Sequence, residues 1–545
     1  MSGRDAGRTI SHYRRVGGKP QVGYPLGAWY NDLGKTMWIH TLHNIRDAAV
    51  GMERAGEPRM DYEAVIGIEV HVELATRSKM FCGCSADFFG QEPNTNVCPV
   101  CMGYPGTLPV INEQAVTYAM RVGLALHCEI AQFSKFDRKN YTYPDLPKGY
   151  QISQYDLPLC RNGWIDIEVD GHSRRIGIRR AHLEEDTAKE SHVGPSSLVD
   201  FNRSGVPLLE IVTEPDLHSG EEARQLLTKL RSILRSLGVS SADMEKGAMR
   251  CEPNVSVRPV GEAALGVKTE IKNLNSFRSA KLAIEFEIER QSQALRRGDE
   301  IEQVTMGWNE RDNRTVVQRT KEYADDYRYF PEPDLPPLEL RPERVAVIAA
   351  SLPELPDARS ERFVDQYGLR QSDAKVLASD TDVADYFEEA IAAARPHGID
   401  PVDVSNWVSG ELFRLLNEGG IEISRSPVAP EALVGLLRNV ERDVVNANTA
   451  KAVLAEMFET GRSADAIIAA RGLAQISDAN EIEALVQRAV EENPRPLEQY
   501  LSGKDAILGF FIGQVMRASR GRANPQVVRE VLTAYLEELR GSLPR

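Results

Sequence analysis

The sequence predicts an α+β protein in which an antiparallel β-sheet domain precedes an all-helical region. Residues 65–74 alternate strictly between apolar and polar side chains, as a half-buried strand does. Further strand-like stretches follow, and the helical patterns between them do not alternate evenly with the strands, which favours α+β over a doubly wound sheet. From about residue 342 helical periodicity dominates.

Length and composition are typical of a globular protein with several domains. The chain has 545 residues, enough for three or more domains, with 42% hydrophobic and 27% charged residues, as in globular proteins. A net charge of −15 argues against general nucleic-acid affinity, although a local basic patch could still bind RNA. Seven cysteines without a disulfide pattern indicate a reducing compartment. We find no apolar run that spans a bilayer, so we expect a cytoplasmic protein without membrane contact.

We expect four segments along the chain: an extension over 1–60, the sheet domain over 61–345, a helical domain over 346–470 and a tail over 471–545. Met60 directly precedes the first strand. One hypothesis is that Met60 is the natural start, and the alternative is a flexible appended arm. Residues 501–545 carry seven basic and four acidic residues, which indicates either an RNA contact or a solvated terminal face.

Predicted helices flank and follow the strands. They cover 112–130, 217–238 and 276–297 and, after a Pro-punctuated connector at 323–337, 358–367, 371–378, 380–396, 402–417, 430–442 and 446–459.

The opening strand presents three ligand-type side chains on one face. Glu69, His71 and Glu73 alternate with apolar residues, so they point to the same side. Two carboxylates beside an imidazole are costly unless a cation neutralises them. Such ligands suit Mg²⁺ or Mn²⁺ held together with phosphates. The alternative is an ordinary solvated face of an antiparallel sheet.

Later strands add carboxylates and cations in the same alternating pattern. A strand over 176–186 ends in His182-Leu183-Glu184-Glu185-Asp186. The other candidates are Glu210 and Glu214, then Arg250, Glu252, Asn254 and Ser256, and finally Lys268, Glu270 and Lys272. Repulsion would destabilise a bare face of this kind, and divalent cations with an ATP triphosphate would relieve it. Because the sequence has neither a P-loop nor a kinase signature, we predict another ATP-binding architecture.

Four cysteines form a C-x-C and a C-x₂-C pair, Cys82 with Cys84 and Cys98 with Cys101. Four thiolates on two tight turns suit a tetrahedral Zn²⁺ site without an open position, which would be structural. The alternative is four ordinary buried thiols. We interpret Cys128, Cys160 and Cys251 as core residues.

Residues 135–155 are basic, aromatic and interrupted by Pro and Gly, and they include Arg138 and Lys139. Such a loop can stack a base and hold phosphates, which predicts a nucleotide or RNA contact. The alternative is a solvated loop with anchoring tyrosines.

Nine motifs, in one order over about 61–545, resemble the B subunits of the tRNA-dependent amidotransferases, the GatB family. They include V-I-G-I-E-V-H-V-E-L, S-K-M-F-C-G-C, R-K-N-Y-x-Y-P-D, H-L-E-E-D-T-A-K, G-V-P-L-L-E-I-V-T-E-P-D, M-R-C-E-P-N-V-S-V, E-I-K-N-L-N-S-F, D-D-Y-R-Y-F-P-E-P-D and a tail motif beginning G-x-x-x-G-Q-V-M-R-A-S. Residues 1–60 have no counterpart in this pattern.

The resemblance implies an ATP-dependent ligase of translation. It implies that the γ-phosphoryl group of ATP moves to the side-chain carboxylate of Glu-tRNA(Gln) or Asp-tRNA(Asn), and that ammonia then forms the amide. The ammonia would come from glutamine through a separate amidase (A) subunit, with a small third (C) subunit completing a heterotrimer. It also implies a sheet domain similar to the cradle-like catalytic domain of glutamine synthetase and a YqeY-like, tRNA-binding tail.

The resemblance also assigns candidate roles to residues. It implies Glu69, His71 and Glu185 as Mg²⁺ ligands, with the choice between Glu184 and Glu185 left open. Further catalytic candidates are Glu210, Glu252, Glu270, Arg250 and Lys272, and cofactor-binding candidates are Arg138, Lys139, Asn254 and Asn273. Cys82, Cys84, Cys98 and Cys101 match the zinc-bearing members, and Glu73 is interpreted as a rim or structural residue.

Two other functions are compatible with parts of the sequence. A stand-alone carboxylate–amine ligase would explain the carboxylate-lined sheet but not the helical region with a basic tail. A zinc-stabilised tRNA scaffold without catalysis would explain the tail but not the carboxylates. The sequence shows no amidase signature, so glutamine hydrolysis needs a partner, and whether Gln-tRNA, Asn-tRNA or both are made stays open.

Overall fold

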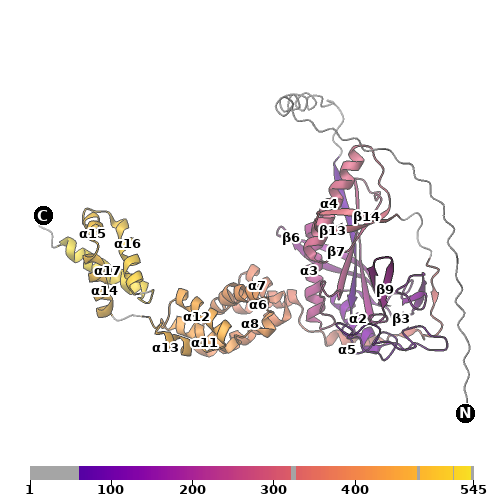
Figure 1. Cartoon of the computed structure of the whole chain (residues 1–545), viewed down its shortest axis with the longest axis horizontal. Helices are drawn as coiled ribbons and strands as arrows, with labels where there is room; N and C mark the ends of the chain where they lie inside the picture. The colour runs from indigo at the N-terminus through magenta and orange to yellow at the C-terminus, as the bar shows by residue number, and fades with distance from the viewer. Residues whose placement is uncertain (1–60, 321–326, 476–478, 520, 542–545) are drawn as a thin grey trace, which may run out of the picture. The chain divides into compact units, whose positions relative to one another are not determined.

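Figure 1 shows the computed structural model of the chain, which describes residues 61–320, 327–475, 479–519 and 521–541. The predicted extension over 1–60, with the Met60 hypothesis, lies outside the described residues, as does the start of the predicted connector at 323–326.

A mixed sheet with β1 at its centre organises the first part of the chain. Within the described residues the sheet has nine strands in the order β14-β13-β12-β11-β1-β10-β7-β6-β2. Their bounds are β1 Tyr62–Glu73, β2 Glu129–Ile130, β6 Cys160–Val169, β7 His172–Glu185, β10 Pro207–Thr213, β11 Met249–Pro259, β12 Thr269–Lys272, β13 Val304–Asn309 and β14 Arg314–Thr320. The prediction of an antiparallel sheet is wrong for β12 and β13, which are parallel because helix α4 (Phe277–Arg296) crosses between them.

Helices of the described chain pack on the apolar face of this sheet. Helices α2 (Glu113–Ala125), α3 (Gly220–Ser236) and α4 confirm three predicted helices, and α3 and α4 lie along one side of the sheet in Figure 1. The apolar residues of β1 are buried beneath them in one core, which leaves the alternate side chains on the opposite face. Each helix starts at a side-chain cap, for example Ser219, whose hydroxyl accepts a hydrogen bond from the amide of Glu222.

Smaller sheets lie beside the main one. Strands β4 (Asp137–Asn140), β5 (Tyr150–Ser153) and β15 (Phe330–Pro331) form one, β3 (Phe133–Ser134) and β16 (Leu338–Glu339) a second, and β8 (Lys189–Val193) and β9 (Ser196–Asp200) a hairpin. Side chains of β5 reach Glu184 on the polar face of β7, so this small sheet partly covers that face. The region predicted as a basic aromatic loop therefore contains two strands.

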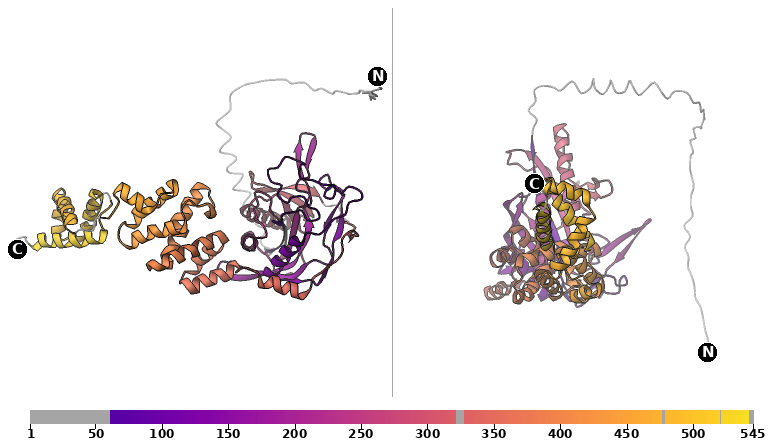
Figure 2. Two further views of the ribbon diagram at one scale, coloured as in Figure 1. Left: turned by 90° about the horizontal axis from the view of Figure 1, so that it is seen from below. Right: turned by 90° about the vertical axis from the view of Figure 1, so that its left-hand side faces the viewer.

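From residue 342 the described chain is helical, as Figure 2 shows in orange and yellow. The helices are α5 Pro342–Ala350, α6 Pro356–Tyr367, α7 Gln371–Ala378, α8 Thr381–Ala394, α9 Pro401–Asn406, α10 Phe413–Gly419, α11 Pro430–Glu441, α12 Ala447–Thr460 and α13 Ala464–Arg471. The helix predicted at 402–417 is interrupted by a π-helical segment, Trp407–Leu412, between α9 and α10. Most of these helices share a core of their own.

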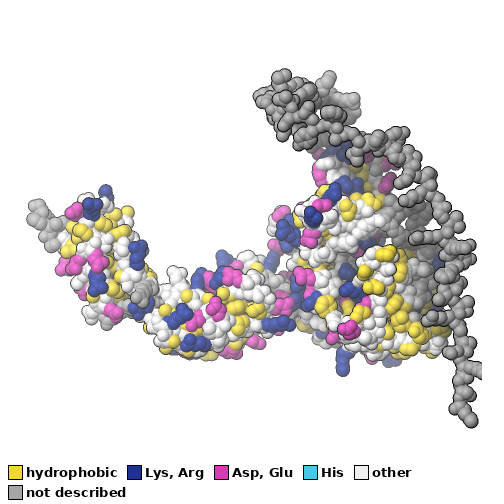
Figure 3. Space-filling model, in the orientation of Figure 1, with side chains coloured by type: hydrophobic (Ala, Val, Ile, Leu, Met, Phe, Trp, Pro, Cys, Tyr) yellow, Lys and Arg dark blue, Asp and Glu magenta, His cyan; other side chains and the backbone are white. Residues whose placement is uncertain are grey.

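The tail has a separate small core, to which α14 (Ala479–Glu491), α15 (Pro494–Leu501), α16 (Leu508–Ala518) and α17 (Pro525–Gly541) contribute. On the face drawn in Figure 3, lysine and arginine side chains are interspersed with acidic ones over the helical segments. Arg540, one of the basic residues of the tail, forms an ion pair with Asp505 (2.9 Å) and lies over the ring of Tyr500. None of the helices in the described part of the chain combines the length and apolar character of a bilayer span.

Candidate active site

The polar face of the sheet carries charged side chains from neighbouring strands in register. His71 lies between Glu210 of β10 and Arg250 of β11. Two residues earlier on β1, Glu69 lies opposite Glu252. Because alternate residues of a strand share a face, these pairs form successive rows along β1.

The first group, which we call the histidine cluster, consists of His71, Glu184 and Glu210. Their ligand atoms all lie within 4.8 Å of one another. His71 Nε2 is 3.6 Å from Glu210 Oε2. His182, whose Nε2 atom is 3.3 Å from Glu184 and 3.4 Å from Glu210, sits between the two carboxylates.

The structure brings Glu184, and not Glu185, into the histidine cluster. Both are buried residues at the end of β7, where adjacent side chains point to opposite faces. Glu184 accepts hydrogen bonds from Ser153 Oγ (2.6 Å) and Gln151 Nε2 (3.0 Å). Glu185 instead forms an ion pair with Lys148. The geometry therefore favours Glu184 over Glu185 as the ligand-type residue.

The histidine cluster is electrostatically balanced by the protein itself. Burial acts to raise the pKa of Glu184, but the Lys139 charge and His182 outweigh it and hold this pKa at about 2. Burial acts to lower the pKa of His71, but its hydrogen bond to Glu210 and the Glu210 charge raise it to about 9. The pKa of Glu210 stays below its ordinary value despite burial, because His182 and His71 stabilise the carboxylate.

The second group, the glutamate cluster, consists of Glu69, Glu252 and Glu270, whose carboxylates also lie within 4.8 Å of one another. Lys272 Nζ is 3.0 Å from Glu252 Oε2 and 3.5 Å from Glu270 Oε1. Asn254 Nδ2 donates a hydrogen bond to Glu69 Oε1 (3.1 Å). The structure thus brings together four predicted residues of β11 and β12 with Glu69.

The glutamate cluster keeps an excess of negative charge. The pKa of Glu69 lies above its ordinary value because of burial first and then the charges of Glu210 and Glu252. Lys272 faces three carboxylates, and these hold its pKa above the ordinary value against the effect of burial. A further cation would relieve the repulsion among the carboxylates.

Both clusters fit a hard divalent cation by the chemistry of their donors. Carboxylate oxygens, with one imidazole in the histidine cluster, are ligands that Mg²⁺ and Mn²⁺ accept. Each cluster supplies three ligand atoms and no thiolate. Such ions usually keep further positions for water and phosphate oxygens.

Arg250 belongs to a third charged group at the end of β1. Its guanidinium donates a hydrogen bond to Asp186 Oδ2 at 2.6 Å. Glu73 joins this group, and burial together with Asp186 raises the pKa of Glu73 to about 8. This contact with buried Asp186 fixes Arg250 next to His71 on the polar face.

Three other candidates lie outside both clusters. Arg138 forms a two-pronged ion pair with buried Glu332 (2.6 and 2.8 Å), which ties β4 to the chain after β15. Asn273 is exposed just beyond β12 with φ of 61°. Glu214 follows β10 after a register shift and pairs with Arg179 at 2.6 Å. Lys139, by contrast, is close enough to influence Glu184.

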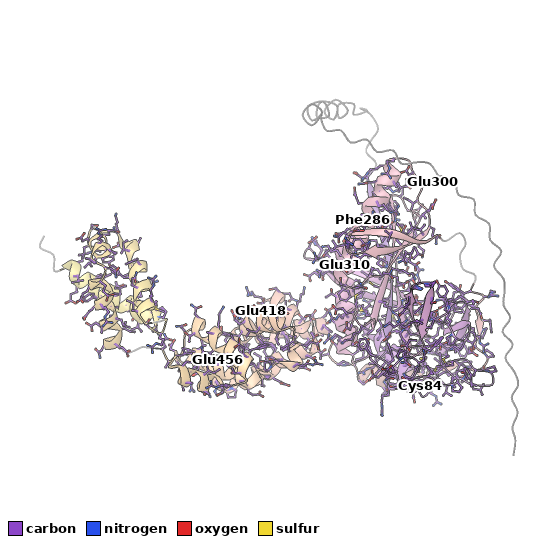
Figure 4. The ribbon with its side chains drawn as sticks, viewed as in Figure 1. Cys84, Phe286, Glu300, Glu310, Glu418 and Glu456 are labelled. Carbon is purple, nitrogen blue, oxygen red and sulfur yellow. The ribbon has the colours of Figure 1, made fainter. Side chains whose placement is uncertain are left out.

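The four predicted zinc ligands converge although they come from two loops. The Sγ atoms of Cys82, Cys84, Cys98 and Cys101 all lie within 4.8 Å of one another. Cys84, labelled in Figure 4, lies at the end of the sheet domain opposite Glu300 in that view. Buried Lys79 points into this group, with Nζ 3.8 Å from Cys101 Sγ and 2.9 Å from the carbonyl oxygen of Asn96.

The electrostatics favour a thiolate at Cys101, whereas burial raises the pKa of Cys84 to about 11. The hydrogen bond with Cys82 and the charge of Lys79 contribute to lowering the pKa of Cys101 to about 5, against the effect of burial. Four thiols at this spacing are the donor set of a closed tetrahedral Zn²⁺ site. The structure also confirms Cys128, Cys160 and Cys251 as buried residues.

Sequence reasoning assigned no role to three side chains of these groups. His182 and Asp186 flank Glu184 at two-residue intervals on β7 and just beyond it, so strand alternation was the signal that could have found them. Lys79 had no such signal, because its contact to Cys101 depends on how two loops fold together.

Comparison with known proteins gives two family matches. Residues 64–346 match the GatB/GatE catalytic domain and residues 385–536 match the GatB domain. Curated relatives named as B subunits of aspartyl/glutamyl-tRNA(Asn/Gln) amidotransferase cover most of the chain. The relative from Caldanaerobacter subterraneus subsp. tengcongensis is 54% identical over 480 residues, 88% of this chain and 100% of the relative. That from Thermomicrobium roseum is 54% identical over 483 residues, 88% of this chain and 99% of the relative.

Proposed function

The chain belongs to the family of aspartyl/glutamyl-tRNA(Asn/Gln) amidotransferase B subunits, and from this premise we propose that its sheet domain activates a misacylated tRNA with ATP. The substrates are Glu-tRNA(Gln), Asp-tRNA(Asn) or both, and the products are the corresponding amides. One observation carries the proposal: two ligand clusters lie in successive rows on one face of the sheet, with Lys139, Arg250 and Lys272 beside them.

The proposed reaction has two steps, phosphorylation of the carboxylate and attack by ammonia. An oxygen of the side-chain carboxylate on the tRNA attacks the γ-phosphorus of ATP, the bond to the β-phosphate oxygen breaks, and ADP leaves. Ammonia then attacks the acyl carbon of the acyl phosphate, phosphate leaves, and the nitrogen loses a proton to give the amide. Activation is needed because a free carboxylate has no good leaving group.

Each group of the face has a place in this scheme. His71, Glu184 and Glu210 would hold one Mg²⁺ or Mn²⁺, and Glu69, Glu252 and Glu270 would hold another. A bound ion supplies positive charge that stabilises phosphate oxygens as charge develops on them. Lys272 and Arg250 are fixed cations for the phosphates, and Asn254 orients Glu69.

The remaining parts complete a multi-subunit enzyme. Ammonia would come from glutamine in the amidase partner. The small third partner would hold the other two subunits together, and the complex would act in the cytoplasm. The sheet domain would be a glutamine-synthetase-like cradle, and the tail over 471–545 would be a YqeY-like module that grips tRNA. Zn²⁺ on the four cysteines would have a structural role, because no ligand position stays open.

The test uses the complex of the full chain with its partner subunits. We expect ATP hydrolysis to be stimulated by Glu-tRNA(Gln) or Asp-tRNA(Asn), and the two charged tRNAs to show which amide is made. Glu69→Ala should abolish phosphoryl transfer and leave the glutaminase reaction of the amidase partner intact, whereas Glu300→Gln, at an exposed site, should change neither. A rate of ATP hydrolysis that neither charged tRNA increases would contradict the proposal. Loss of tRNA binding in Glu69→Ala would instead indicate that the chain is a tRNA scaffold.

A further inference from the structure

Four tyrosines form a continuous row beside the histidine cluster, and we call them the tyrosine row: Tyr141, Tyr327, Tyr329 and Tyr155. The first three meet edge to face, with ring centroids 5.8 Å apart for Tyr141 and Tyr327 and 5.9 Å for Tyr327 and Tyr329. The last pair is stacked, with centroids 4.0 Å apart and planes within 8°. The row joins the chain around β4 and β5 to the segment before β15.

The inner end of the row is connected to the histidine cluster. Lys139 Nζ lies 5.1 Å from the ring centroid of Tyr327 and 5.9 Å from that of Tyr141. Tyr141 Oη donates a hydrogen bond to Gln151 Oε1 (3.2 Å). Gln151 in turn donates to Glu184 Oε2 (3.0 Å). A single glutamine side chain thus separates the row from a candidate metal ligand.

The outer end of the row is exposed. Tyr155 keeps 52% of its surface accessible although its ring is stacked on Tyr329. In the described part of the chain, none of the four tyrosines belongs to the apolar core or to the half-buried residues packed on it. An aromatic stack that fills no core and ends in solvent leaves a flat surface on which another ring can stack.

We propose that Tyr155, backed by Tyr329, stacks an adenine base of the substrate and so orients its reactive group toward the histidine cluster. The proposal rests on the proposed function, which supplies two adenosines: that of ATP and the 3′-terminal adenosine of the charged tRNA. Stacking of an unpaired base on tyrosine needs no particular base edge, so both share the chemistry that the row recognises.

The first experiment measures steady-state kinetics of the assembled complex with Tyr155→Ala. We expect the KM of one substrate, ATP or charged tRNA, to rise about tenfold while kcat changes little, since one stacked base is lost. Tyr155→Phe keeps the ring and should retain the wild-type KM. The matched control is Tyr104→Ala, because Tyr104 is similarly exposed (58%) and lies outside both the tyrosine row and residues 135–155.

The second experiment identifies the source of the base. The complex is titrated with a tRNA carrying 2-aminopurine in place of its terminal adenine and, separately, with 2-aminopurine riboside triphosphate. Stacking quenches 2-aminopurine, so the ligand that uses the row should be quenched by the wild type and Tyr155→Phe and not by Tyr155→Ala.

The stacking proposal would be overturned if the wild type, Tyr155→Phe and Tyr155→Ala quenched both ligands equally. An unchanged KM for both substrates in Tyr155→Ala would also overturn it. The fluorescence titration needs only binding, so it decides the proposal by itself. A wild-type complex that binds and quenches a ligand but forms no amide would count against the proposed function alone.

Discussion

The histidine cluster and the glutamate cluster are neighbouring rows on the same strand, yet their charges are balanced differently. In the histidine cluster, Glu184 and Glu210 are stabilised as carboxylates by His71, His182 and Lys139. In the glutamate cluster, Lys272 lies 3.0 Å from Glu252 and 3.5 Å from Glu270. The pKa of Glu69 is raised by burial and by its acidic neighbours.

This difference indicates how each site would respond to a divalent cation. In the histidine cluster a cation has to displace the proton of His71, whose raised pKa keeps that proton bound near neutral pH. In the glutamate cluster a cation relieves repulsion that the protein leaves in place. We therefore expect metal binding to be coupled to proton release in the first cluster and only weakly so in the second.

The largest effect should come from removing one carboxylate from either cluster. We expect Glu210→Gln and Glu252→Gln each to lower kcat for amide formation by at least about a hundredfold, because each loses charge that stabilises the phosphoryl-transfer transition state. Charged-tRNA assays with the assembled complex measure this. If only one of the two variants lost activity, the clusters would not share one reaction.

The choice between adjacent glutamates should give a smaller but clear difference. Glu184→Gln removes a ligand-type carboxylate of the histidine cluster and should weaken Mn²⁺ binding about 10- to 100-fold, a loss typical of altered metal sites. Glu185→Gln breaks the ion pair with Lys148 and should leave Mn²⁺ affinity near that of the wild type. Isothermal titration with Mn²⁺ compares the two, and a reversed order would restore Glu185 as the ligand.

The pH dependence should separate the clusters further. Because the metal-free pKa of His71 is about 9, each ion bound at lower pH releases one proton. Affinity of the histidine cluster should therefore rise with pH, by up to about tenfold per pH unit, and level off above pH 9. Mn²⁺ titrations from neutral to alkaline pH measure this slope. His71→Asn should flatten it, and an equal slope in that variant would exclude His71 as its cause.

The smallest effect on the clusters should follow from loss of zinc. Cys84→Ser removes one of four thiols of a site built on separate loops, so bound zinc and the free energy of unfolding should fall. Mn²⁺ affinity of both clusters should change less than about twofold, because none of the four cysteines belongs to either cluster. Metal analysis and urea unfolding test the first expectation, and a large loss of Mn²⁺ binding would show that the sites are coupled.

Strand alternation allowed much of this face to be predicted. The pattern of residues 65–74 placed Glu69 and His71 on one side, and the same reasoning grouped Arg250, Glu252 and Asn254 on β11. It failed at Glu214, because a register shift between Val212 and Thr213 ends the alternation of β10.

Contacts between distant parts of the chain were beyond such patterns. Arg138 was predicted as a phosphate contact, but no sequence pattern predicted its ion pair with Glu332, which lies 194 residues later. Likewise the spacing of the cysteines predicted the four-thiol site, but not buried Lys79 beside it. The choice of Glu184 over Glu185 depends on which face of β7 lies against the side chains of β5, and no local sequence pattern specifies this.

The most direct test of the two-cluster account counts bound Mn²⁺ by electron paramagnetic resonance, with the complex and a non-hydrolysable ATP analogue. The wild type is compared with two isosteric variants, Glu210→Gln in the histidine cluster and Glu252→Gln in the glutamate cluster. The account predicts one ion in each cluster, with each variant losing only the ion of its own cluster. Wild-type Mn²⁺ content unchanged by both substitutions, or no bound Mn²⁺ at all, would contradict it.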